Sequence, residues 1–166
     1  MSVFVVDSNF FIEAHRSTYP LDVAQSFWNK VRQLADTGTI ISIDKVRDEI
    51  YDHQDTLKLW CENNLPRDFF KDSTAVMTEY AQVAGWAASQ SHLYLPKALN
   101  EFLDAETADA FLVAYSLADN QNRILVTQEI SEPNRRNKIK IPDACLALSV
   151  RSCNTIQMFR QLGETF

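Results

Sequence analysis

Short runs of apolar residues alternate with longer amphipathic stretches along the chain. Residues 3–6 (VFVV), 40–43 (IISI) and 124–127 (ILVT) are mostly β-branched or otherwise apolar, which predicts strands that are buried on both faces. Residues 139–141 could extend a strand, and residues 155–158 predict a further one. Each run is short enough for a strand and too short for a helix.

Apolar residues at intervals of three and four predict helices between these strands. The helical stretches cover residues 24–35, 45–59, most of 69–102, 105–118 and 142–148, and a short helix ends the chain. Strands that alternate with helices predict an α/β fold with a central parallel β-sheet covered on both faces. The chain has no repeat or linker, so residues 1–166 are expected to form a single domain.

The composition fits a folded domain and excludes several classes of protein. Hydrophobic residues make up 46% of the chain, and its three glycines lie too far apart to form a phosphate-binding loop. Three cysteines without CxxC spacing argue against a disulfide framework or structural zinc, so reduced thiols in a cytoplasmic protein are expected. No apolar run could span a bilayer and no secretory signal pattern is visible, so no membrane association is expected.

The net charge of −6 argues against a protein that binds nucleic acid through a broad basic face. A metalloenzyme can still meet phosphate groups, because carboxylates hold the cation and the cation contacts the phosphate. The positions of the acidic residues therefore matter more than their number.

Carboxylates follow three of the predicted strands. Asp7 comes directly after residues 3–6, Glu49 lies six residues after the second strand, and Glu129 lies two residues after the third. In open parallel sheets, ligands bind outside the carboxyl ends of the strands, so these acids are expected at one edge. Asp109, at the start of a predicted helix, is the fourth candidate.

Each of these acids also has an interpretation without chemistry. Asp7 could cap a helix, Glu49 could form an internal salt bridge, Asp109 could interact with a helix dipole, and Glu129 could be an exposed loop acid. Glu49 favours a functional role because it lies on the apolar side of its predicted helix, where carboxylates are rare. The remaining acids of that helix are expected to form one solvated stripe: Asp44, Asp48, Asp52 and Asp55.

Four carboxylates at one edge match the demand of Mg²⁺ or Mn²⁺ for oxygen ligands. The expected chemistry is attack of metal-activated water on a phosphodiester. Ser8, Asn9 and Thr127 would support the acids by orienting them or a bound water. A basic stretch is either a contact for an RNA backbone or a solvated loop, and it contains Arg135, Arg136, Lys138 and Lys140.

Two further residues could approach this edge. His53 lies one helical turn after Glu49, but a structural histidine is the more frequent case. Asp143 could reach the acids or could cap the helix that follows it.

The sequence resembles the PIN-domain nucleases. The resemblance is carried by VFVVDSN at 3–9, VRDEI at 46–50, ADAFLVAYSLA at 108–118 and ILVTQE at 124–129. The match is closest to a PIN-like family of unknown function found beside antitoxin genes in bacteria and archaea. There it extends to FW at 27–28, EFL at 101–103, IPDAC at 141–145 and LGETF at 162–166.

This resemblance implies a three-layer αβα fold and a Mg²⁺- or Mn²⁺-dependent ribonuclease similar to VapC-type toxins. It implies an RNA substrate and a cognate antitoxin protein. Separately, the apolar residues of the middle helices could form the face of a homodimer, but the core of a monomer explains them too. Asp7, Glu49 and Asp109 match the three core acids of the family. The fourth position is usually Asp, whereas Glu129 stands here.

Other functions remain open from the sequence. A catalytically degenerate PIN-like domain could bind a partner without cutting RNA, and the unusual Glu129 favours this slightly. A phosphatase-like hydrolase with Asp7 as nucleophile would need a second aspartate where Asn9 stands. A receiver domain would need paired acids near the first strand and a lysine after the last, and neither is evident.

Overall fold

The computed structural model describes all 166 residues and contains a five-stranded sheet in which every strand pair is parallel. The strand order is β3-β2-β1-β4-β5, so the first strand is central. The strands are β1 (Val3–Val6), β2 (Ile40–Ile43), β3 (Phe70–Lys71), β4 (Arg123–Val126) and β5 (Arg151–Cys153). Because parallel strands need long crossover connections, a helix or a group of helices lies between each strand and the next.

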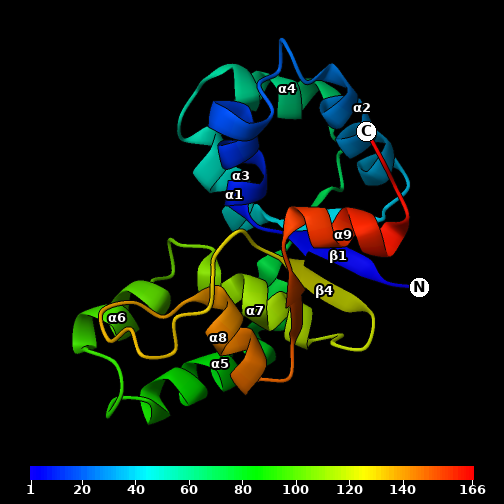
Figure 1. The fold of residues 1–166 in the computed structure, drawn as a ribbon. Coiled ribbons are helices and arrows are strands. Elements are labelled where there is room, and N and C mark those ends of the chain that lie inside the picture. The colour runs from blue at the N-terminus through cyan, green and yellow to red at the C-terminus, as the bar shows by residue number, and fades with distance from the viewer.

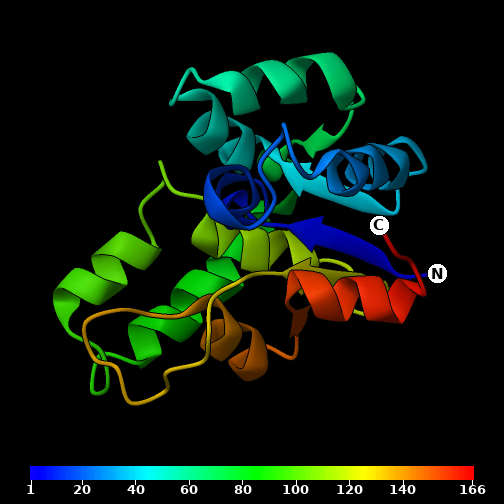
Figure 2. The same cartoon turned by 45° about the horizontal axis from the view of Figure 1, so that its top comes forward.

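The connections to β2 and β3 cover one face of the sheet, and those to β4 and β5 cover the other (Figures 1 and 2). The first group is α1 (Ser8–Glu13), α2 (Gln25–Asp36), α3 (Asp44–Tyr51) and α4 (Thr56–Asn64), with a π-helical turn at Ala14–Thr18. The second is α5 (Met77–Ser89), α6 (Pro96–Phe102), α7 (Asp109–Leu117) and α8 (Ile141–Ala147), preceded by a 3₁₀ turn at Ser73–Val76. The last helix, α9 (Thr155–Leu162), returns to the first face, where Phe159 lies 6.2 Å from Phe27 of α2 between ring centroids.

The fold is therefore a three-layer αβα sandwich around a central parallel sheet, as the alternation of apolar runs and helical stretches predicts. A single cluster of 43 buried hydrophobic residues forms its core. The strand β2 is buried along its whole length, and so is α7 from Ala110 to Ser116. None of the helices combines the length and the apolar composition that crossing a membrane requires.

The predicted helix over residues 45–59 is wrong as one element, because the chain turns between α3 and α4. Gln54 has a positive φ of 45°, and the Asp55 carboxylate caps α4 by accepting hydrogen bonds from the N–H groups of Leu57 and Lys58. The cap formed by Asp55 therefore starts a new helix at a point where the spacing of apolar residues alone predicts one continuous helix. The expected solvated stripe of acids is confirmed for Asp48, Asp52 and Asp55, which are exposed. It is wrong for Asp44, which is half-buried and accepts a hydrogen bond from Ser73 N–H on a distant segment.

The strands at the sheet edges also differ from the prediction. Residues 155–158 begin α9, because Asn154 and Gln157 form a reciprocal capping box, and the strand is Arg151–Cys153 instead. Residues 139–141 form no strand, and α7 begins at Asp109 rather than at residue 105. Strand β3 contains only two residues, which is too short for any pattern to reveal it.

Phe27 packs against aromatic residues from both ends of the chain. Its replacement therefore tests how much this aromatic packing contributes to stability. Its ring packs against Tyr19, Trp28, Phe159 and Phe166, and the side chain is almost fully buried. We expect Phe27→Ala to lower the free energy of unfolding by about 3–5 kcal/mol, because it leaves a cavity in the core. Phe166→Ala should cost less than half as much in urea denaturation, since that ring is 44% exposed. Equal losses would contradict this.

Candidate functional site

The carboxyl ends of the strands and the N-termini of several helices meet at one edge of the sheet. Helix α1 starts directly after β1, and α3 starts directly after β2. Helices α7 and α8 precede β4 and β5, so they run against the strands and also begin at this edge. Partial positive charge therefore accumulates where the chain places its candidate acids.

Asp7 is the most deeply buried of these acids, with 3% of its surface exposed. It is the N-cap of α1, and its Oδ1 accepts a hydrogen bond of 3.0 Å from Phe10 N–H. Burial raises the pKa of Asp7 to about 7, while hydrogen bonds from Thr127 and Phe10 oppose this rise. The negative charges of Asp109 and Glu129 raise the pKa further, which places all three carboxylates within electrostatic range.

Asp109 is the first residue of α7, as expected for an acid in the first turn of a helix. Burial raises the pKa of its carboxyl to about 6, and the negative charges of Glu129 and Glu49 act in the same direction. Lys138 and Lys140 oppose them and lower this pKa. We name Asp7, Glu49, Asp109 and Glu129 the acid cluster, because their charges are coupled through Asp109.

Glu49 of α3 reaches across to the start of α7. Its Oε1 accepts a hydrogen bond of 2.9 Å from the N–H of Ala108, the N-cap residue of that helix. Glu49 takes part in no ion pair, so the internal salt bridge considered from the sequence does not exist in this structure. Its carboxylate instead satisfies a free N–H group at a helix N-terminus.

Glu129 has a similar role at the start of α8. Its Oε2 accepts a hydrogen bond of 2.8 Å from the N–H of Ile141, and its Oε1 lies 3.6 Å from the Lys138 ammonium nitrogen. The Glu129 side chain is only 12% exposed, so it is not a solvated loop acid. Its own N–H donates a hydrogen bond of 3.1 Å to the Thr127 hydroxyl, and Thr127 also lowers the pKa of Asp7.

Carboxylate oxygens of this kind are the donors that Mg²⁺ and Mn²⁺ prefer. The mutual repulsion of the acid cluster is also of the kind that a divalent cation relieves. As placed, however, no three His, Cys, Asp or Glu side chains form a group that could hold a metal ion. The carboxylates of Glu49 and Glu129 instead accept hydrogen bonds from N–H groups at helix N-termini, those of Ala108 and Ile141.

The structure also places the residues expected to support the acids. Thr127 lies between Asp7 and Glu129 and is 3% exposed. Ser8 and Asn9 occupy the first turn of α1, where Ser8 is half-buried and Asn9 exposed, and neither side chain hydrogen-bonds to Asp7. Thr127 is therefore the one supporting residue that contacts the acid cluster directly.

Most basic residues of the stretch after β4 have polar partners outside the acid cluster. Arg135 pairs with Glu132, Lys140 pairs with the same glutamate, and the Arg136 guanidinium donates to the backbone oxygen of Leu93. Lys138 alone forms an ion pair with a member of the acid cluster, whereas Lys140 acts on Asp109 only through its charge. Among the basic candidates for an RNA contact, Lys138 is thus the one that the structure places beside the acids.

The last two candidates lie outside the acid cluster. Asp143 accepts hydrogen bonds from the Ser131 hydroxyl and the Glu132 N–H, so it fastens the loop before α8. His53 is exposed in the turn between α3 and α4. Although it follows Glu49 by one helical turn, its side chain forms no hydrogen bond or ion pair with the acid cluster.

A cavity of about 260 Å³ opens beside Asp109. Lys138 lines it together with Asp109, and Thr107 and Glu101 add polar groups. Its apolar wall is formed by buried side chains of α6 and of the loop before α8: Ala98, Phe102 and Ile139. Asp109 is therefore the member of the acid cluster that is accessible from this side.

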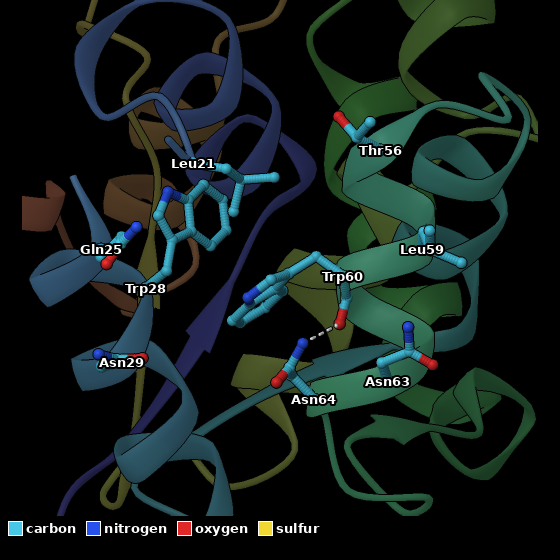
Figure 3. Close-up of a pocket in the computed structure, with 9 residues that line it drawn as sticks. All are labelled: Leu21, Gln25, Trp28, Asn29, Thr56, Leu59, Trp60, Asn63 and Asn64. Carbon is cyan, nitrogen blue, oxygen red and sulfur yellow. Dashed lines mark hydrogen bonds between the residues drawn. The ribbon is translucent and has the colours of Figure 1, made fainter. Parts of the chain in front are cut away.

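A larger cavity of about 390 Å³ lies elsewhere, between α2 and α4 (Figure 3). Trp28 and Trp60 meet there edge to face with their ring centroids 4.8 Å apart, and Asn64 donates to the backbone oxygen of Trp60. Gln25 and Asn29 face this cavity from α2, and α4 contributes Thr56, Leu59 and Asn63. None of the lining residues is charged, so phosphodiester hydrolysis has no acid or cation to use in this cavity.

The fold and this edge define an all-parallel αβα protein with a cluster of coupled carboxylates at the ends of its strands. The chain belongs to the family described as "Domain of unknown function (DUF4411)", whose model matches residues 4–166. No curated protein matches the chain, and no solved structure matches it either.

The raised pKa of Asp7 predicts how stability depends on pH. An acid whose pKa is higher in the folded state loses stabilisation as pH rises from its unfolded value towards the folded value, here from 3.8 to about 7. Replacement by Asn keeps an N-cap and removes this loss. Asp7→Asn should therefore gain about 2–3 kcal/mol relative to the wild type between pH 5 and pH 8, measured by urea denaturation.

Asp72→Asn is the matched control, because Asp72 also caps a helical turn but hydrogen bonds from Thr74 lower the pKa of its carboxyl. That variant should show no gain at high pH. A gain of equal size in both variants would show that burial of Asp7 is not its cause.

Proposed function

We propose that this protein is a metal-dependent endoribonuclease of the PIN-like type. The observation that supports this most is the acid cluster, in which acids from four separate segments are electrostatically coupled at the carboxyl edge of a parallel sheet. Ordinary structural acids do not need to be buried together, since each one raises the cost of ionising the next. The resemblance of the surrounding motifs to PIN-domain nucleases supports the same function.

The proposed function assigns a different role to each residue of this site. Asp7, Asp109, Glu49 and Glu129 would hold Mg²⁺ or Mn²⁺, and Thr127 would fix Asp7 and Glu129 relative to each other. The bound ion supplies an activated water and neutralises charge on the phosphoryl oxygens. Lys138, in the wall of the cavity beside Asp109, is placed to contact an RNA phosphate.

The proposed biological role is that of a toxin similar to VapC-type toxins, held inactive by a cognate antitoxin protein. The resemblance to a family found beside antitoxin genes supports this role. A cytoplasmic location agrees with three buried cysteines, all of them free thiols. A homodimer is part of the same proposal.

A second candidate is a partner-binding domain without catalytic activity. It is favoured by the absence of a preformed group of metal ligands and by the use of Glu49 and Glu129 as helix caps. The uncharged cavity between α2 and α4, with Leu59 59% exposed beside it, is a surface that such a domain could use. Metal binding distinguishes the two candidates.

Calorimetric titration with Mn²⁺ is the first test. We expect the wild-type protein to bind Mn²⁺ and the Asp7→Asn/Asp109→Asn double variant to lose this binding, because both central carboxylates become neutral. An Asp104→Asn/Glu106→Gln variant is the control, since it removes two nearby exposed acids outside the acid cluster. Equal binding by the wild type and the double variant would place the metal elsewhere and favour the partner-binding candidate.

Cleavage of RNA is the second test. We expect Asp7→Asn and Asp109→Asn each to lower the cleavage rate at least about 100-fold, because each removes a group that acts on charge in the transition state. Thermal unfolding should show that both variants remain folded, since neutralising a repulsive cluster does not destabilise it. Full activity in either variant would exclude that residue from the active site.

A further inference from the structure

Lys138 makes the only ion pair that any member of the acid cluster has. Its ammonium nitrogen lies 3.6 Å from Glu129 Oε1, and its side chain lines the cavity beside Asp109. It therefore pairs with one carboxylate of the acid cluster and shares a cavity wall with a second, and these two carboxylates repel each other. The other oxygen of Glu129 is bound to Ile141 N–H, so both oxygens of this carboxylate have partners.

We infer that Lys138 is the resident counter-ion of the acid cluster and must leave Glu129 before that carboxylate can bind a divalent ion. This inference rests on the proposed function, and it concerns how the same site is regulated. In this structure one acid of the cluster, Glu129, is already paired with a cation of the protein itself, Lys138.

Neighbouring cations do not share this position. Lys140 is directed to Glu132 at 3.8 Å, Arg135 pairs with the same residue, and Arg136 contacts a backbone oxygen. Lys138 is followed by Ile139, which is 2% exposed and fixes the backbone there. The lysine side chain itself is 40% exposed, so it can rotate into solvent without unfolding the loop.

The consequence is an exchange of cations at one carboxylate. While Lys138 is bound, the charge of the acid cluster is partly offset and the apo protein gains stability. If Glu129 held a divalent ion, the Lys138 ammonium group would be repelled by it and would move into the open part of the cavity. There it becomes free to bind an anionic group such as an RNA phosphate.

The experiment compares Mn²⁺ binding by the wild type, Lys138→Gln and Lys97→Gln. Lys97 is the matched control, because it also pairs with a glutamate lining this cavity, Glu101, but lies outside the acid cluster. We expect Lys138→Gln to bind Mn²⁺ about three- to tenfold more tightly, as removal of one unit charge near the ion predicts. Lys97→Gln should match the wild type, and only Lys138→Gln should lower the melting temperature without metal.

A second measurement separates displacement from a general charge effect. Lysines of the wild-type protein are acylated with and without Mn²⁺, and the modified positions are quantified by mass spectrometry. Release from Glu129 should raise the labelling rate of Lys138 several-fold while Lys97 and Lys140 stay unchanged. Tighter binding by Lys138→Gln without this change in labelling would overturn the exchange.

The remaining outcomes keep the two proposals apart. Binding of Mn²⁺ by Lys138→Gln alone would support both, because the internal cation would then block the site fully. Equal binding by all three proteins with unchanged labelling would overturn the role of Lys138 and leave the ribonuclease proposal intact. Absence of binding in all three would overturn the metal site and the role of Lys138 together.

Discussion

The structure depends on carboxylates that satisfy the N-termini of helices at one edge of a parallel sheet. Asp7 caps α1, Glu49 binds the N-cap N–H of α7, and Glu129 binds the first N–H of α8. Each of these hydrogen bonds satisfies a backbone N–H group that would otherwise be partly buried without an acceptor. Two of them also join segments far apart in the chain, so the same acids hold the layers together and concentrate negative charge.

This arrangement gives the same carboxylates two competing roles, the capping of helices and the proposed binding of a metal ion. A carboxylate that caps a helix is stabilised by the positive end of the helix dipole, which makes burial of several acids tolerable. Burial and repulsion nevertheless raise the pKa of Asp7 and of Asp109. The acid cluster therefore holds unfavourable charge that an added cation would relieve, and Lys138 already relieves part of it.

Short-range patterns account for much of the fold that the sequence predicts. The runs at residues 3–6 and 40–43 are strands with those bounds, and Arg123–Val126 lies one residue from the predicted third strand. These strands are central and buried on both faces, so their composition alone distinguishes them. Edge strands are different, because β5 is largely exposed and β3 is only two residues long, and pairing with a neighbour defines both.

The sequence by itself determined the αβα class, the central strands and the acids that follow them, because apolar periodicity and strand order suffice for these. Only the tertiary structure decided what the acids contact. Glu49 meets Ala108 and Glu129 meets Ile141 across 59 and 12 positions of the chain, and no local pattern encodes such partners. The pairing of Lys138 with Glu129 is also set by how the loop before α8 folds back over the sheet edge, which depends on packing rather than on propensity.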